Sequence, residues 1–373
     1  MKIVHITPYY PPHLGGMENT VKELAERTAK IGYDVRVYTS NEGCNEKSIS
    51  KNCVSIHLLK SIEIPGVPLI LPMLPFKLLS VIDRNTIVHV HYILNFSIDF
   101  AIIISKIKKA KIVSHVHIDP LPLSSLFGFL NPTYKKLFWR RILRLSNAVI
   151  CQTENYVDII SKKYGVKRDK CVIVSSGINL KKFDKMGECT TSKEIKDILF
   201  VGRLSEQKNI PMLLSAFKLI QGNYDITLHI VGAGKERIAI NKIITKEKID
   251  NVILHGRVPD EKLMDLYSMS DIFILPSTYE SFPLTLLEAM ASGLPIVASD
   301  ILGVRNVLKD CGTLVNPTPE NFADAIIKVI EDNDLRRNLI KKGKEKVKDY
   351  DWDKITDRVI EIYKEVSRSE YER

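Results

Sequence analysis

The sequence lacks the cysteine patterns that hold small or metal-dependent folds together. Its six cysteines are scattered along the chain, at Cys44, Cys53, Cys151, Cys171, Cys189 and Cys311. They form no C-x-x-C or zinc-finger spacing, and scattered cysteines in a chain of 373 residues are typical of buried thiols in a reducing compartment. We therefore expect no disulfide framework. A chain of this length can form two domains with complete cores.

The sequence also lacks an apolar run long enough to cross a membrane. The longest apolar region, residues 62–82, contains four prolines, which cannot all lie in one spanning helix. The first residues, Met1 to Ile6, read as a short strand that ends before Pro8, so we expect no signal peptide there. These features predict a cytoplasmic protein, either free or bound peripherally to the inner face of the membrane.

Positive charge is in excess, with 54 Lys and Arg against 44 Asp and Glu and a net charge of +10. This excess favours anionic partners such as phosphates or an acidic membrane surface, although extra surface lysines alone would give the same balance. Residues 133–144 mix cations with apolar residues at helical spacing, as interfacial membrane helices do. An ordinary helix packed on a sheet has the same pattern, so both interpretations stay open.

Strand-like and helix-like segments alternate along the chain, which predicts parallel sheets covered by helices on both faces. In the first half we expect strands at residues 3–7, 35–39, 87–90, 111–116, 148–152 and 171–174, and helices at 18–31, 96–109 and 133–144. The polar stretch 181–196 reads as a linker between domains. A second series of strands follows at 197–201, 227–231, 252–255, 272–275, 296–298 and 312–315. From Asn321 onward the chain reads as helical, with a break near residues 349–352.

The segment from Asp271 to Asp300 carries the most specific local pattern. It reads as strand, turn, helix and strand, with Glu280 just before the helix and Glu288 inside it. We expect Ser281 to cap this helix and Pro283 to lie in its first turn. A helix start at the carboxyl end of a parallel strand suits anionic ligands, but two carboxylates there repel phosphate. We therefore expect the glutamates to bind neutral hydroxyl groups.

Three further loops that follow strands have the form of phosphate-binding turns. Gly15-Gly16 precedes a helix, and paired glycines let backbone amides come close to a ligand. Arg203 and Lys208 share one loop, where a guanidinium and an ammonium can bind a diphosphate. Gly232 lies in the sequence VGAGK, which completes neither the dinucleotide fingerprint nor the P-loop. Taken alone, the glycine pair is more typical of a structural loop, and the Arg203 and Lys208 pair is more typical of two solvated cations.

Two histidines, His115 and His117, stand at the end of an expected strand, and we expect their side chains on opposite faces of the sheet. His117 leaves the strand and is the better candidate for a site. The spacing of the two is poor for joint ligation of a metal. We also see no metal pattern around His5, His13, His89 and His91.

Six blocks of sequence occur in the order found in a known family. They are GGME at 15–18, SGIN at 176–179, GRL with KN at 202–209, PSTYESFP at 276–283, LEAMASG at 287–293 and GTLV at 312–315. Together they resemble the group 1, family 4 retaining glycosyltransferases of GT-B fold over nearly the whole chain. The most specific part is the E-x7-E pair, Glu280 and Glu288.

The resemblance implies an α/β fold of two Rossmann-like domains that face each other across a deep cleft, with a C-terminal helix crossing back to the first domain. Residues 1–178 would form an acceptor domain with residues 352–373 packed back on it, and residues 179–351 a nucleotide-sugar donor domain. The implied activity is a retaining, metal-independent transfer of a hexosyl-type sugar from a UDP- or GDP-linked donor, without a cofactor. The acceptor would be a glycan or a lipid-linked hydroxyl in polysaccharide, lipopolysaccharide or glycolipid assembly. No nucleic acid would be bound.

The matching positions take over the family's roles. Arg203 and Lys208 match the diphosphate-binding pair. Glu288 matches the carboxylate that takes the ribose hydroxyls, and Glu280 the one near the transferred sugar. The residues implied as catalytic are Glu280, His117, Arg203 and Lys208. The further donor-binding positions are Gly16, Gly232, Arg257, Val258, Ser281, Phe282, Pro283 and Leu284.

The sequence departs from the family pattern at three positions. Ser176 and Asn179 replace the usual Asn and Asp of the NG(I/V)D block, and Asn306 stands where the family often has Glu. Two alternatives use the same fold, a nucleotide-sugar epimerase and a subunit that binds a nucleotide sugar without catalysis. An epimerase needs further acid and base groups at the sugar, which the sequence does not show. The intact glutamate pair and its two cations argue against a binding subunit.

Overall fold

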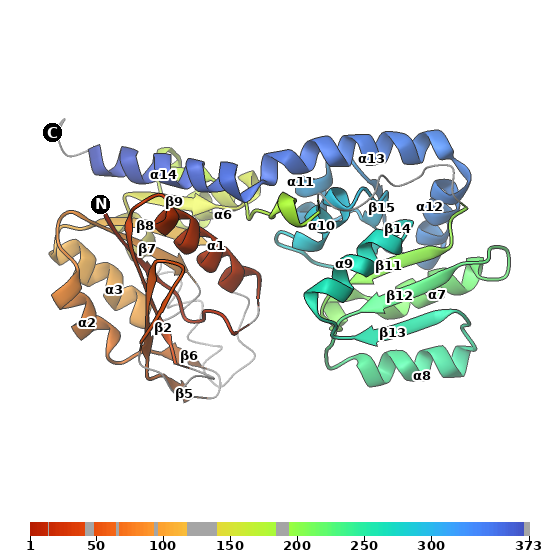
Figure 1. Cartoon of the computed structure of the whole chain (residues 1–373), viewed down its shortest axis with the longest axis horizontal. Coiled ribbons are helices and arrows are strands. Elements are labelled where there is room, and N and C mark those ends of the chain that lie inside the picture. Colours follow the sequence, from red (N-terminus) through yellow and green to blue (C-terminus); the bar gives the residue numbers. More distant parts are fainter. Residues whose placement is uncertain are drawn as a thin grey trace. The chain divides into compact units, whose positions relative to one another are not determined.

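The computed structural model describes residues 1–13, 15–41, 48–64, 67–92, 96–117, 140–183 and 194–368. The chain divides into two compact units, one of Met1–Gly177 with Trp352–Arg373 and one of Ile178–Asp351 (Figure 1). It passes into the second unit between Gly177 and Ile178, so the stretch 181–196 that we predict as a linker lies beyond the boundary. Residues 184–193 of that stretch fall outside the described residues.

The first unit contains an eight-stranded sheet with the order β10-β9-β8-β7-β1-β2-β4-β3. Its strands are β1 (Lys2–Ile6), β2 (Asp34–Ser40), β3 (Ser48–Lys51), β4 (Val54–Leu59), β7 (Thr86–Tyr92), β8 (Lys111–Val116), β9 (Ala148–Cys151) and β10 (Cys171–Ile173). All neighbouring strands pair in parallel except β3 and β4, which pair antiparallel. Neither β3 nor β4 was predicted from the sequence. The strands that follow β1 in the chain, β2 to β4, lie on one side of β1, and β7 to β10 lie on its other side. The strand order therefore reverses between β1 and β7.

Helices cover both faces of this sheet. They are α1 (Gly16–Lys30), α2 (Leu74–Val81), α3 (Phe96–Ile107), α5 (Arg140–Leu145), α6 (Glu154–Tyr164) and α14 (Trp352–Arg368), and a two-stranded ribbon of β5 (Ile62–Ile64) and β6 (Val67–Ile70) precedes α2. One core contains the apolar sides of α1 and α14, and a second core contains those of α2, α3 and α6. Because apolar residues recur every three or four positions along α14, the last helix buries one face against the first unit.

The second unit contains a six-stranded, fully parallel sheet with the order β13-β12-β11-β14-β15-β16. Its strands are β11 (Asp197–Val201), β12 (Thr227–Val231), β13 (Val252–Gly256), β14 (Ile272–Leu275), β15 (Ile296–Ser299) and β16 (Thr313–Val315). Its helices are α7 (Ile210–Ile220), α8 (Arg237–Glu247), α9 (Asp260–Met269), α10 (Leu284–Ala291), α11 (Leu302–Leu308), α12 (Pro319–Glu331) and α13 (Asn333–Val347). Here too the order reverses, between β11 and β14. The parallel α/β architecture expected from the alternating pattern is thus present in both units.

Two helical predictions need adjustment. The C-terminal region is helical and breaks at residues 348–351 as expected, but it also breaks at Asp332, whose side chain caps α13. Of the helix predicted at 133–144, only α5 lies within the described residues. The cysteines that the structure describes, Cys53, Cys151, Cys171 and Cys311, are free. None of the described helices is long and apolar enough to span a membrane.

Candidate active site

The glutamates and cations singled out by sequence lie at the point where the second sheet reverses its strand order. Arg203 and Lys208 follow β11, and Glu280 follows β14, its neighbour in the sheet. In open parallel sheets a crevice opens at such a switch point, beyond the carboxyl ends of the two strands, and ligands bind there. The loops after β11 and β14 are tied together, since Thr278 N donates to Gln207 O at 2.9 Å. The topology therefore brings these predicted residues together at the carboxyl ends of two central strands, which we call this edge of the sheet.

Lys208 and Glu280 form the closest charged contact at this edge. The Lys208 ammonium donates to Oε1 of Glu280, and the Ser277 hydroxyl donates to the same oxygen at 2.6 Å. Both side chains are largely buried, with 15% and 9% of their surfaces exposed. In the described part of the chain both bonds go to Oε1, which leaves Oε2 as the oxygen able to accept from a ligand. An ammonium carries three donor hydrogens, so Lys208 keeps capacity for a bound anion.

Glycines let the loops of this edge pack closely. Gly232 has φ +137°, and a Cβ built on it would lie 1.8 Å from the carbonyl oxygen of Gly202. A Cβ on Gly303, at the start of α11, would lie 1.9 Å from the carbonyl oxygen of Glu280. Side chains at these positions would push the Arg203 loop and the Glu280 segment out of place. The VGAGK loop thus acts as a support for the loop that carries the cations.

Glu288 lies in α10 and faces a buried tyrosine that the sequence analysis did not single out. The Tyr267 hydroxyl donates to Oε2 of Glu288 at 2.7 Å. Burial raises the pKa of Glu288, while the hydrogen bond from Tyr267 acts in the opposite direction. The same burial, together with the carboxylate, raises the pKa of Tyr267 well above its usual value. No local signal in the sequence pairs these residues, because they lie on different helices, α9 and α10.

The expected start of α10 is wrong by two residues. Pro283 is the N-cap with φ −77° and ψ 104°, the helix begins at Leu284, and no side chain caps it. Ser281 therefore lies before the helix and does not cap it. The reason is local, since the residue before a proline is pushed towards extended backbone. Among the other predicted donor positions, Phe282 lies 5.8 Å from Tyr350 between ring centroids.

The predicted base-binding positions, Arg257 and Val258, follow β13 at the far edge of the sheet. Arg257 is exposed, and Val258 packs partly on the core of the second unit. Gly232 N donates to Gly256 O at 2.8 Å, which joins this loop to the loop after β12. The residues predicted for the donor within the second unit are therefore carried by the loops after β11, β12, β13 and β14 and by α10.

The two remaining predicted residues, Gly16 and His117, belong to the first unit. Gly16 is the exposed first residue of α1, directly after β1 and its loop. His117 is buried directly after β8 and lies 4.1 Å from His115 between ring centroids. The expectation that these histidines face opposite sides of the sheet is wrong, because residues two apart on a strand share a face. His117 Nε2 is 3.1 Å from His91 Nδ1, so His117 joins a histidine cluster that the sequence analysis missed.

Comparisons with known proteins identify the family of the chain. A family described as "Glycosyltransferase Family 4" matches residues 14–182, and one described as "Glycosyl transferases group 1" matches residues 183–346. The chain belongs to the group 1, family 4 glycosyltransferases. This glycosyltransferase is 28% identical over 385 residues to a phosphatidyl-myo-inositol mannosyltransferase of Mycobacterium leprae, which covers 99% of the chain and 98% of the relative. It is 26% identical over 387 residues to an uncharacterized glycosyltransferase of Methanocaldococcus jannaschii, with 98% of each chain covered.

Solved structures show the fold of this glycosyltransferase to be GT-B. A glycosyltransferase from Rickettsia africae superposes with a TM-score of 0.79 at 19% identity, over 98% of each chain. The Anabaena protein HepE in complex with UDP superposes with a TM-score of 0.75 at 17% identity, over 98% of this chain and 100% of that one. At these identities the likeness establishes the fold alone.

Proposed function

We propose that this glycosyltransferase moves a hexosyl-type sugar from a UDP- or GDP-linked donor to an acceptor hydroxyl, with retention of the anomeric configuration. The observation that carries the proposal is the ion pair of Lys208 and Glu280 at the switch point of the second sheet. One partner suits a diphosphate and the other suits sugar hydroxyls. A nucleotide-sugar donor could therefore place its diphosphate at Lys208 and its sugar hydroxyls at Glu280, which are adjacent. Glu288 in α10 would accept from the ribose hydroxyls.

The chemistry needs a stabilised leaving group. The bond from the anomeric carbon to the diphosphate oxygen breaks, and its electron pair goes to the diphosphate. The acceptor oxygen bonds to the anomeric carbon on the same face, and its proton passes to the departing diphosphate oxygen. Lys208 and Arg203 would offset the charge that builds on the diphosphate, since preformed cations in a partly dry site act most strongly on developing charge. The proposed transfer relies on these two cations and does not include a metal.

A thermal-shift screen of UDP, GDP and ADP tests donor binding. A nucleotide present at 100 times its Kd stabilises the native state by about 2.7 kcal/mol, which corresponds to a Tm rise of roughly 5–10 °C for a unit of this size. We expect UDP or GDP to give this shift. If Glu288 binds the ribose, the matching 2′-deoxynucleotide shifts Tm less, and the difference disappears in Glu288→Gln. Absence of any shift with all three nucleotides contradicts the proposal. Formation of a labelled glycoside from the preferred donor distinguishes an enzyme from a binding subunit.

The acceptor side of the proposal rests on an apolar surface of the first unit. Helices α2 and α3 pack side by side (Figure 1). Large apolar side chains are exposed on these two helices. The exposed residues are Met73, Phe76, Leu79, Phe100, Ile103 and Ile107. The exposed lysines Lys77 and Lys106 lie on the same two helices. Bulky apolar groups mixed with cations are typical of surfaces that bind anionic membranes, which fits a lipid-linked acceptor.

The basic segment at 133–144 gives weaker support for membrane binding. Leu143 in α5 is fully buried, so the described end of this segment packs into the first unit like an ordinary helix. Arg144 Nε donates to Gly165 O, the C-cap of α6, at 2.8 Å. A cation at a helix C-terminus is stabilised by the helix dipole. At least one cation of the segment therefore has a structural role.

Flotation with anionic vesicles tests the apolar surface. We expect the protein to float with phosphatidylserine-containing vesicles, and Phe76→Ser with Phe100→Ser to reduce the bound fraction at least tenfold. The reason is that burying one large apolar side chain contributes about 1.5–3 kcal/mol. The matched control is Ile238→Ser, because Ile238 is 71% exposed in the second unit. A wild-type protein that stays wholly unbound, or a control that loses binding equally, contradicts the membrane proposal.

A further inference from the structure

Five histidines gather on one face of the first sheet, near the point where its strand order reverses. They are His5 on β1, His89 and His91 on β7, His115 on β8 and His117 directly after it. All five are buried, with at most 3% of any side chain exposed. The strand register explains the grouping, since His5 is paired with His89 and His91 with His115. The signal in the sequence is an H-x-H pattern in each of two neighbouring strands.

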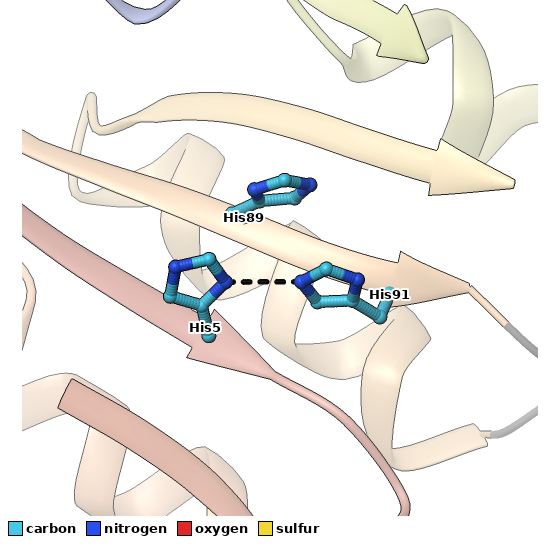
Figure 2. Close-up of side chains that lie close together, drawn as sticks. All are labelled: His5, His89 and His91. Carbon is cyan, nitrogen blue, oxygen red and sulfur yellow. Dashed lines mark hydrogen bonds between the residues drawn. The ribbon is translucent and has the colours of Figure 1, made fainter. Parts of the chain in front are cut away.

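We propose that His5, His89 and His91 bind one divalent transition-metal ion of the zinc class, as a structural site inside the first unit. Figure 2 shows the rings of His5 and His91 facing each other between β1 and β7, with the ring of His89 close by over β7. His5 Nδ1 and His91 Nε2 are 2.9 Å apart, and one nitrogen from each of the three rings lies within 4.8 Å of the others. In a tetrahedral zinc site with Zn–N bonds of about 2.0–2.1 Å, ligand nitrogens are about 3.3 Å apart. Small shifts of side chains would close the site around an ion.

The hydrogen bonding of these rings leaves nitrogens available for a metal. Among the described residues, Nε2 of His5 and Nε2 of His89 have no hydrogen-bond partner, although both atoms are buried. A buried polar atom without a partner costs about 1–3 kcal/mol, and a bound metal would offset this cost at Nε2 of His89. Burial also lowers the pKa of His5 to about 3 and holds that of His89 and His91 well below the usual value.

The outer contacts of two ligands match those of metal-binding histidines. Nδ1 of His89 is 2.5 Å from the Tyr363 hydroxyl, and Nδ1 of His91 is 3.1 Å from Nε2 of His117. A ligating histidine almost always has its second nitrogen held by a hydrogen bond, which fixes the ring and its tautomer. Tyr363 lies in α14, so a metal at this site would connect β1, β7 and the last helix. This connection is a structural role, separate from the donor site of the second unit.

Zinc titration of the full-length protein, after chelator treatment and dialysis, tests the site. We expect one zinc per chain by elemental analysis and a Tm several degrees higher than that of the metal-free protein. His91→Asn and His5→Asn should each abolish this stoichiometric binding. Tyr363→Phe should weaken zinc binding about 10- to 100-fold while leaving the three ligands in place. His57→Asn is the control, because His57 stacks on Tyr38 and is not part of the cluster.

Further measurements separate this site from other zinc binding. His117→Asn should keep one zinc per chain, whereas its loss would assign the ion to His91, His115 and His117 and overturn the proposal. Cobalt substituted for zinc should give no thiolate charge-transfer band, and such a band would assign the ion to cysteines. No bound zinc in the wild-type protein also overturns the proposal. If His91→Asn does not fold, the stoichiometry of the wild-type protein and the affinity of Tyr363→Phe still decide the question. None of these measurements uses activity, so their failure leaves the proposed function untouched.

Discussion

Glu280→Gln is expected to lower kcat roughly 100- to 1,000-fold, the range seen when one preorganised electrostatic group is removed from an active site. Gln keeps the shape of the side chain, and the Ser277 hydroxyl can still donate to it. The change removes the charge that pairs with Lys208. It also removes the charge from the hydrogen bond that we propose between Glu280 and the transferred sugar. Lys208 then loses its positioning partner, so two groups are impaired by one substitution. Steady-state transfer of labelled sugar from the preferred donor measures the effect.

A matched pair in the same unit provides the control for this experiment. Glu247 pairs with Lys218 at 3.0 Å, and both side chains are 45% exposed. Exposed ion pairs contribute little, so Glu247→Gln should leave kcat and Tm close to those of the wild type. The nucleotide-dependent Tm shift should persist in Glu280→Gln, which shows that the variant is folded and binds the donor. A kcat within threefold of the wild-type value would contradict the role of Glu280. A double-mutant cycle with Lys208→Met measures how far the two residues act together.

Truncation after Asp351 is expected to unfold the first unit while the second unit stays folded. Helix α14 belongs to the first unit and buries Trp352, Val359 and Tyr363, among others, in its core. Burying each large apolar side chain contributes about 1.5–3 kcal/mol, so the loss of the helix approaches the whole stability of a domain, about 5–15 kcal/mol. Hydrogen exchange by mass spectrometry should show lost protection in residues 2–116 and retained protection in 197–315. The nucleotide-dependent Tm shift, a property of the second unit, should persist.

Two further chains make this result specific. Truncation after Arg368 keeps all of α14 and should leave the protection of the first unit unchanged. Trp352→Ala should destabilise the first unit by about 3–5 kcal/mol, since Trp352 is 2% exposed. Its ring packs against the backbone of Gly177, where a built Cβ would lie 2.6 Å away. If the first unit keeps its protection after truncation at Asp351, α14 is not part of the core of that unit.

Local patterns in the sequence were sufficient to predict most of the elements. The strands at 111–116, 197–201, 227–231 and 272–275 have the bounds that the structure gives them. Such short apolar runs, bounded by turns, depend on near neighbours only, so they can be read from the sequence. Polar antiparallel strands such as β3 carry no comparable apolar signal and were missed. The start of α10 was placed two residues early, because the effect of Pro283 on the preceding backbone outweighed the capping preference of Ser281.

The sequence by itself determined the glutamate pair and its relation to a helix start, since an eight-residue spacing places Glu280 before α10 and Glu288 within it. Only the tertiary structure decided which groups meet these carboxylates. Lys208 and Glu280 are 72 residues apart in the chain, and Tyr267 and Glu288 are 21 apart. The histidine cluster, too, exists only because β1, β7 and β8 are neighbours in the sheet. Strand order follows from burying whole faces of sheets and helices, a global balance that no local pattern contains.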